Sequence, residues 1–308
     1  MAKNFIGIDL SKARLDIHDP QTGKDSCCPN ARTGLRRFVR GLGPDDIPVF
    51  EATSGCDRLL IEELTLGKRR FVRVNPLHAW HYAQSLNLPK TDRVDARMLA
   101  RFGTERQPAP TPLRDPARDE LAELTGRRDQ LKRMETEEKN RLARTANPIA
   151  ARDIRASIKT LAQRIARFDA EIRACIAHNP KLSETARLIT SVPGIGPVVA
   201  AGLMAWMPEL GTLDRRAVAS LGGLAPKARE SGMYKGHRRL GQGRCHVRRM
   251  LYMAALSLWR NPGVVGDMVP RMRERGKPNK VILIALARKI LTFANAVLRD
   301  RKPFQSNA

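Results

Sequence analysis

The first 75 residues alternate short apolar segments typical of β-strands with segments of helical periodicity. Four strands are predicted, with the sequences FIGIDL, RLDIHD, PVFEA and RFVRVN. Helices are predicted around Leu35 to Leu42 and from Arg58 to Leu66. A chain that alternates in this way must pack helices on a sheet, so the pattern restricts the first part of the molecule to an α/β fold.

The spacing between the strands predicts how they pair. Only residues 11–13 separate the first two strands, so these should form an antiparallel hairpin, whereas the later strands arrive by helical crossovers and should pair in parallel. The result is a mixed sheet. Asn75-Pro76 ends the last strand, Leu88-Pro89 breaks the next segment, and Asp92 to Arg106 is a predicted helix with acidic residues in its first turn.

The rest of the chain is predicted to be helical. Prolines at 108, 110, 112 and 116 mark a linker, and a charge-rich helix then runs towards Asn147-Pro148. The helix after that carries a coiled-coil seam, and the helix before it a weaker stripe. The seam is Ile154, Ile158, Leu161, Ile165, Phe168, Ile172 and Cys175, and the stripe is Leu121, Leu124, Leu131, Met134 and Leu142. These helices can pair as an antiparallel hairpin within the chain, or the seam can pair between subunits.

Three domains follow from these patterns. Residues 1–112 form an α/β domain, residues 113–180 a coiled-coil helical hairpin, and residues 181–308 a mostly helical domain whose short helices are broken by glycine.

The charge of the chain points to a polyanionic partner. Fifty-six Lys and Arg residues stand against 31 Asp and Glu, which gives a net charge of +25 and a strong attraction to DNA or RNA. A solubilising surface charge rarely reaches this size, and an anionic membrane lacks support because no lipid-anchor signal accompanies the charge.

The five cysteines are odd in number and lack the paired spacing of a zinc site, so free thiols in a reducing cytosol are expected. The N-terminus reaches Asp9 too soon for the apolar region of a signal peptide. Prolines and glycines between 193 and 197 interrupt the apolar stretch from 188 to 210. We therefore expect a cytoplasmic protein without a membrane partner.

Four acidic residues are candidates for a metal site. Asp9 and Glu51 come at the ends of predicted strands, while Asp92 and Asp95 lie three apart at a helix start and so share one face. Taken singly, each has a simpler role as a turn residue, a strand-end acid, an N-cap or a first-turn acid. Together, in so basic a chain, carboxylates favour Mg²⁺ held against a phosphodiester.

The motifs IGIDLSKARLDI, FEATSGC, VNP and KTDRVDARMLA resemble the DEDD transposases of insertion sequences. The resemblance covers nearly the whole chain. It implies a RuvC-like, ribonuclease H-type N-terminal domain, in which the metal-binding tetrad corresponds to Asp9, Glu51, Asp92 and Asp95. The chain departs from the family pattern after E-A-T, where Ser54 precedes Gly55 instead of a direct glycine.

The segment SVPGIGPVVAAGLMA is similar to a helix-hairpin-helix motif. In such a motif the backbone amides near Gly194 and Gly196 face a phosphate of DNA or RNA. A glycine-rich connection inside a packed helical core is the alternative.

Ser231 lies in the basic segment from Leu221 to Leu256. From its chemistry alone, a serine beside glycine is usually a turn residue. The resemblance implies instead that Ser231 attacks the scissile phosphate and becomes a phosphoserine. A serine hydroxyl needs a metal or a base for this attack, and the tetrad would supply the metal.

Basic residues of the second half are candidates for contact with nucleic acid. Those near Ser231 would clamp phosphates, and those further on would line nucleic acid, with a solvated charged surface as the alternative. The candidates are Lys227, Arg229, Lys235, Arg238, Arg239, Arg248 and Arg249.

The predicted function is DNA recombination. The resemblance implies Mg²⁺, donor and target double-stranded DNA, a structured non-coding guide RNA, a homodimer that assembles into a tetramer, and a nucleoid-associated location in a bacterial cytoplasm. One alternative is a hydrolytic RuvC-like nuclease or junction resolvase, in which metal-bound water attacks and Ser231 is structural. Another is a non-catalytic nucleic-acid-binding assembly factor that acts through its charge alone.

Overall fold

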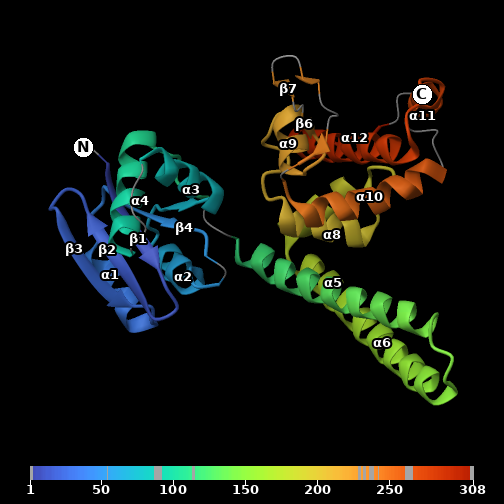
Figure 1. The fold of residues 1–308 in the computed structure, drawn as a ribbon, viewed down its shortest axis with the longest axis horizontal. Helices are drawn as coiled ribbons and strands as arrows, with labels where there is room; N and C mark the ends of the chain where they lie inside the picture. Colours follow the sequence, from blue (N-terminus) through green and yellow to red (C-terminus); the bar gives the residue numbers. More distant parts are fainter. Residues whose placement is uncertain are drawn as a thin grey trace. The chain divides into compact units, whose positions relative to one another are not determined.

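The protein divides into two compact units, Met1–Arg114 and Asp115–Ala308 (Figure 1). The computed structural model describes residues 3–53, 55–86, 92–112, 115–227, 230–231, 234–235, 239–241, 243–260 and 266–305. Within these ranges the backbone alone is described for residues 92–94, 227, 230–231, 234–235 and 239.

Unit 1 is built on a five-stranded mixed sheet with the order β3-β2-β1-β4-β5. Strand β1 pairs antiparallel with β2 and parallel with β4, which confirms the predicted hairpin and the predicted parallel crossover. The strands are β1 (Asn4–Leu10), β2 (Arg14–Asp19), β3 (Lys24–Pro29), β4 (Asp46–Glu51) and β5 (Val72–Val74). The sequence did not predict β3, because this edge strand, KDSCCP, is largely exposed and lacks an apolar pattern.

Helices cover both faces of this sheet. Alternation along β1 sends Ile6 and Ile8 into a core with α1 and α2, and sends Phe5 into a second core with α3 and α4. The helices are α1 (Arg32–Gly41), α2 (Arg58–Leu66), α3 (Pro76–Ser85) and α4 (Asp92–Arg106). Helix α3 was not predicted, because Asn75-Pro76 is equally typical of a strand end and of a helix start.

Four helices begin with the same local chemistry. Asn75, Asp115, Asn147 and Asn179 each cap a helix by accepting a hydrogen bond from a backbone amide two or three residues ahead. In each case proline follows, where its fixed φ suits the first turn and its missing N–H costs nothing.

Unit 2 contains the predicted helical hairpin. Helices α5 (Pro116–Leu142) and α6 (Pro148–His178) pack along one another, and Leu131 meets Leu161 and Ile165 in the seam. The alternative of pairing within the chain is therefore realised. The hairpin belongs to the same compact unit as the C-terminal helices, and its standing as a separate domain of residues 113–180 stays a prediction.

The other helices of unit 2 share one apolar core. They are α7 (Pro180–Thr190), α8 (Pro197–Trp206), α9 (Arg215–Leu221), α10 (Cys245–Arg260), α11 (Met268–Glu274) and α12 (Asn279–Asp300). Among the helices that the structure describes, α12 alone is long and apolar enough to cross a membrane. Its residues Ile282, Leu286 and Ile290 are fully buried in this core.

Candidate active site

Helix α4 lies directly against β1 because glycine occupies the contact. A Cβ at Gly7 would overlap the carbonyl oxygen of Ala96 and come 2.5 Å from the backbone nitrogen of Ala100. One helical turn further on, a Cβ at Gly103 would come 2.6 Å from the Cβ of Phe5. Small residues in both elements therefore allow backbone-to-backbone packing (Figure 1).

These contacts fix the direction of α4. The helix passes Gly7 before Phe5, so it runs antiparallel to β1 and its first turn lies towards the carboxyl end of the strand. From Gly7 to Asp9 is about 6.6 Å of strand, which corresponds to about four residues of helix. The part of α4 at the level of Asp9 is consequently its first turn, which carries Asp92 and Asp95.

Glu51 ends the neighbouring parallel strand. The register pairs Ile8 with Phe50, so Asp9 and Glu51 are the next residues in line at the carboxyl edge of the sheet. Because Val49 packs in the core beneath α3 and α4, alternation places Glu51 on the face that α4 covers, as it does Asp9. Asp9, Glu51 and Asp95 are all half-buried.

The donor set consists of carboxylates, the oxygen ligands that Mg²⁺ and similar hard cations take. In the described part of the chain, no three Asp, Glu, His or Cys side chains are gathered closely enough to hold a metal ion. The side chain of Asp92 lies outside the described residues. An oxygen of Asp9 accepts a hydrogen bond from the backbone of Leu10 at 3.0 Å. The candidate ligands are all carboxylates carried by the ends of β1 and β4 and by the first turn of α4, and carboxylates suit a divalent cation.

A buried ion pair holds the loop after Glu51. Asp57 is 3% exposed, and its Oδ2 lies 2.6 Å from Nε of Arg73 on β5. Arg73 pairs with Phe50, the residue before Glu51. Neither Asp57 nor Gly7 was identified from the sequence, although a glycine inside an apolar strand is a signal for close backbone approach.

A second ion pair ties α4 to the edge of the sheet. Arg97 donates to Asp25 of β3, with Nη2 and Oδ2 2.5 Å apart, and His18 lies 2.7 Å from the same carboxylate. The hydrogen bond from Arg97, joined by the contact with His18, lowers the pKa of Asp25 to about 2. Arg97 therefore has a structural role in unit 1, since it links α4 to β3.

Short strands carry the segment around Ser231. The outer ladder pairs β6 (Pro226–Lys227) with β9 (Arg239–Leu240), and the inner ladder pairs β7 (Glu230–Ser231) with β8 (Tyr234–Lys235). Ser231 pairs with Tyr234. The side chains of Ser231, Lys227, Lys235 and Arg239, and the whole of Arg229 and Arg238, lie outside the described residues.

Close contacts hold the base of these ladders on the helical core. Gly243 has a φ of +113°, and a Cβ there would overlap the backbone of Gly223. Arg244 binds both carboxylate oxygens of Glu209 at 2.6 Å. Burial raises the pKa of Glu209, but the hydrogen bonds and charge of Arg244 outweigh burial and lower it overall.

Two arginines predicted to contact nucleic acid also bind groups within the protein. Arg248 donates to the carbonyl oxygens of Gly223 and Gly241 at 3.3 and 3.1 Å. Arg249 forms an ion pair with Asp129 of α5 at 3.2 Å, yet its side chain is 48% exposed. Their contact with nucleic acid stays a prediction.

The glycines of the VPGIG motif differ in their surroundings. Gly194 has a φ of +86°, and a Cβ added to it would lie 3.2 Å from the carbonyl oxygen of Ala254. Gly196 is open, since no atom would lie within 4 Å of a Cβ there, and it precedes the first turn of α8. Helices α7 and α8 do pack on each other around this turn. A phosphate contact at Gly196 stays a prediction.

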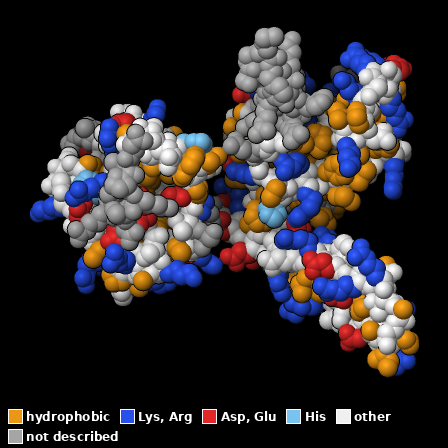
Figure 2. All heavy atoms as spheres, in the orientation of Figure 1, with side chains coloured by type: hydrophobic (Ala, Val, Ile, Leu, Met, Phe, Trp, Pro, Cys, Tyr) orange, Lys and Arg blue, Asp and Glu red, His pale blue; other side chains and the backbone are white. Residues whose placement is uncertain are grey.

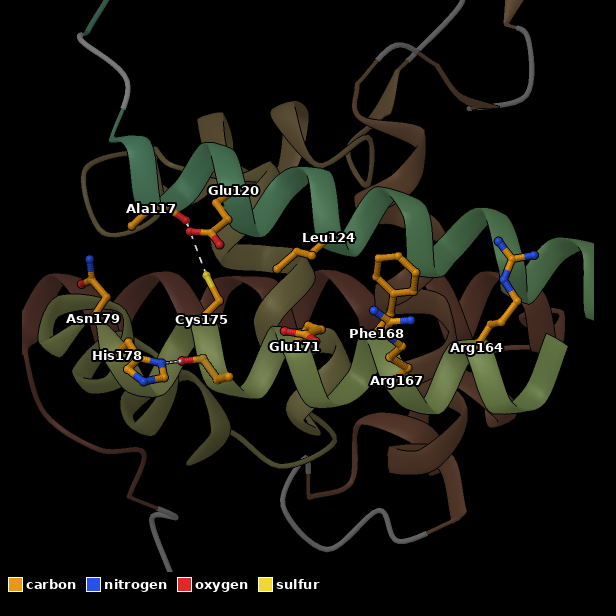
Figure 3. Close-up of a pocket in the computed structure, with 11 residues that line it drawn as sticks. Ala117, Glu120, Leu124, Arg164, Arg167, Phe168, Glu171, Cys175, His178 and Asn179 are labelled. Atoms are coloured by element: carbon orange, nitrogen blue, oxygen red, sulfur yellow. Dashed lines mark hydrogen bonds between the residues drawn. The ribbon is translucent and has the colours of Figure 1, made fainter. Parts of the chain in front are cut away.

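Positive charge is spread over the surface. Figure 2 shows Lys and Arg side chains on the visible faces of both units, with acidic side chains among them on the hairpin. A groove of about 790 Å³ between α5 and α6 has mixed charge (Figure 3). Its charged lining residues are Glu120, Arg164, Arg167 and Glu171. The groove contains none of the predicted site residues.

An α/β unit with acids at its strand ends and a helical unit with a serine-bearing ribbon match the arrangement expected for a DNA transposase or recombinase. Family comparison agrees. A transposase family model matches residues 6–149, and a second, described as the transposase IS116/IS110/IS902 family, matches residues 186–265. The chain belongs to this IS110-type transposase family.

Individual relatives support the assignment. The pilin gene-inverting protein of Moraxella bovis is 30% identical over 99% of this chain and 98% of its own length. The corresponding protein of Moraxella lacunata is also 30% identical, over 99% of this chain and 98% of its own length. An uncharacterized 44.8 kDa protein of insertion element IS116 from Streptomyces clavuligerus is 34% identical over 49% of this chain and 38% of its own length.

Proposed function

We propose that this transposase exchanges DNA strands by metal-assisted attack of Ser231 on a phosphodiester. Asp9, Glu51, Asp92 and Asp95 would hold Mg²⁺, which when bound stabilises charge developing on the phosphate. The observation that carries the proposal is the contact of α4 with Gly7, because it sets the first turn of α4 level with Asp9.

In the proposed step the hydroxyl of Ser231 loses its proton, and its Oγ forms a bond to phosphorus. The bond between phosphorus and the departing deoxyribose oxygen breaks, and that oxygen takes up a proton and leaves as a free hydroxyl end. The phosphoserine conserves the energy of the broken bond, so a second DNA hydroxyl can displace Ser231 without ATP. The full-length match to proteins named for gene inversion supports strand exchange with rejoining of ends.

The resemblance to DEDD transposases adds partners to the proposal. Donor and target DNA would be selected by a structured non-coding RNA, and dimers would pair into a tetramer on the nucleoid in the cytoplasm. The net charge of +25 supports binding of both nucleic acids. Lys227, Arg229, Lys235, Arg238 and Arg239 would clamp phosphates around Ser231.

We also infer that one active centre combines the acids of one subunit with Ser231 of another, since unit 1 carries the acids and unit 2 the serine. Mixing Asp9→Ala with Ser231→Ala protein tests this inference. Recovery of activity in the mixture is expected. If the mixture stays inactive under conditions where wild type assembles, the shared centre is wrong.

The product of the reaction tests the chemistry. Wild-type protein incubated with DNA from the flanks of its own element and Mg²⁺ should give a protein–DNA adduct that survives denaturation. The adduct should be absent in Ser231→Ala and in Asp9→Asn. Two matched controls should keep the adduct: Ser257→Ala, in an exposed position of α10, and Asp45→Asn, in the turn just before β4 at the end opposite Glu51. Free DNA ends without an adduct would support hydrolysis by a junction-resolvase mechanism instead.

A further inference from the structure

Asn30 bridges the two loops that follow Asp9 and Glu51. It comes directly after β3, and its side-chain Nδ2 donates to the carbonyl oxygen of Ser11 at 2.8 Å and to that of Cys56 at 3.0 Å. Ser11 lies two residues after Asp9, and Cys56 lies in the loop after Glu51. A single amide group thus joins the segments that leave the two acid-bearing strand ends.

The orientation of this amide is unambiguous. Both partners are backbone carbonyl oxygens, which only accept hydrogen bonds, so the NH₂ end must face them. The other end, Oδ1, is buried and has no hydrogen-bond partner among the atoms that the structure describes.

Hydrogen bonds hold the Asp9 side of the bridge in place. The backbone N–H of Ser11 donates to the carbonyl of Arg14 at 3.0 Å, and the Ser11 hydroxyl donates to the same oxygen at 2.8 Å. The backbone N–H of Asn30 donates to the carbonyl of Ala13 at 2.9 Å. The turn between β1 and β2 is therefore held on both sides, and Asn30 is fixed to it.

The Glu51 side is held at both ends of its loop. At the near end, the N–H of Ala52 donates to the carbonyl of Val74 at 3.0 Å, which extends the pairing of β4 with β5. At the far end, Cys56 accepts from Asn30, and the next residue, Asp57, is paired with Arg73. Asn30 supplies the link from this loop to the turn after Asp9.

We propose that Asn30 is a positioning residue that sets the separation of the Asp9 and Glu51 carboxylates for a divalent cation. This inference rests on the proposed metal site. Mg²⁺ demands near-ideal geometry, and groups that orient metal ligands strongly affect metal affinity. Without the bridge the two loops adjust independently, so the cation binds more weakly although the sheet remains folded.

Asn4 provides a matched control in the same sheet. Its Nδ2 also bridges two segments, since it donates to Asp19 at 3.1 Å and to Asp46 at 2.9 Å. Asn4 begins β1, so this bridge lies at the opposite end of the strand from Asp9. Loss of either amide removes two side-chain hydrogen bonds from unit 1, but only Asn30 adjoins the acids.

The test is Mn²⁺ binding to the full-length protein, measured by electron paramagnetic resonance of the free ion. Thermal unfolding of each variant is recorded in parallel. Wild type should bind Mn²⁺, and Asp9→Asn should lose this binding. Asn30→Ala should raise the Mn²⁺ Kd about tenfold or more. Asn30→Ser keeps one hydrogen-bond donor, so its Mn²⁺ Kd should lie between those of wild type and Asn30→Ala. If Asn30→Ala does not fold, Asn30→Ser replaces it in the test. Asn4→Ala should keep the Mn²⁺ Kd within about twofold of wild type, even if its melting temperature falls by as much as that of Asn30→Ala.

Three results would overturn the inference. Unchanged Mn²⁺ affinity in folded Asn30→Ala or Asn30→Ser removes the positioning role and leaves the metal site intact. An equal loss of affinity in Asn4→Ala shows that Asn30 acts through general stability. If wild type itself binds no Mn²⁺, or if Asp9→Asn binds it as well as wild type, the proposed metal site fails and the role of Asn30 fails with it.

Discussion

Gly7 of β1 lies against the backbone of Ala96 in α4, so close that a Cβ at Gly7 would overlap the Ala96 carbonyl oxygen. This contact determines how far the first turn of α4 stands from the acid-bearing end of β1. A residue without a side chain thereby controls the geometry of the candidate metal site.

Replacing Gly7 with alanine should force α4 away from the sheet. Backbone atoms cannot move aside as a flexible side chain can, so we expect a loss of about 2–4 kcal/mol in the free energy of unfolding. DNA recombination should be lost as well. Gly41→Ala is the control, because no atom would lie within 4 Å of its new Cβ. Urea denaturation measures both variants, and equal stability of Gly7→Ala and wild type would contradict the packing described.

Replacing Arg73 should lower the free energy of unfolding, because the buried carboxylate of Asp57 loses its ion-pair partner. Asp57 is 3% exposed, and Arg73→Met leaves its carboxylate without this partner, which should cost about 2–4 kcal/mol. The control is Arg101→Met, because the side chain of Arg101 is 56% exposed in its pair with Glu105, so loss of this solvent-screened pair should change stability little. Similar melting temperatures for the two variants would show that the Asp57 pair has no special role.

The ion pair of Glu209 with Arg244 should make stability depend on pH. The pKa of Glu209 is lowered in the folded protein, so the pair stabilises the fold above the unfolded pKa of about 4.3. This contribution is lost as the pH falls through the folded pKa. Because both side chains are about one-third exposed, we expect no more than about 1 kcal/mol. Urea denaturation of wild type and Glu209→Gln should differ at pH 7 and converge as the pH falls below the folded pKa of Glu209; a difference that stays constant would contradict the assignment.

Alanine substitution should destabilise the protein strongly at the buried centre of the hairpin seam and only weakly at its exposed edge. Leu131 is fully buried against Leu161 and Ile165, so Leu131→Ala should cost about 2–4 kcal/mol. Met134 belongs to the same predicted stripe but is 44% exposed, so Met134→Ala should cost less than about 1 kcal/mol. Thermal unfolding measures both. A larger effect at Met134 would instead indicate that this face is covered by another subunit.

The sequence predicts local features of the fold better than contacts distant in the chain. The β1–β2 hairpin follows from a three-residue connection, and α2 from its apolar periodicity. Strand β3 has no apolar pattern, because an edge strand needs only backbone pairing with β2. Helix α3 begins at Asn75-Pro76, a pair that serves equally as a strand end and as a capped helix start.

The candidate site shows the same division. Asp9 and Glu51 could be identified because each ends a recognisable strand, and Asp92 and Asp95 because they begin a helix. Asn30 could not, since its role depends on carbonyl groups of two distant loops. The roles of Arg244 and Arg248 also depend on tertiary partners, and from the sequence both are only part of a basic segment.

The location of a bound metal ion is the most direct test of the proposed site. Crystals of the full-length protein grown with Mn²⁺ would show the ion through its anomalous scattering. We predict an anomalous peak at coordination distance from the carboxylates of Asp9 and Glu51, beside the first turn of α4, and its loss in Asp9→Asn. A peak at other residues, or none at Mn²⁺ concentrations that support recombination, would contradict the account.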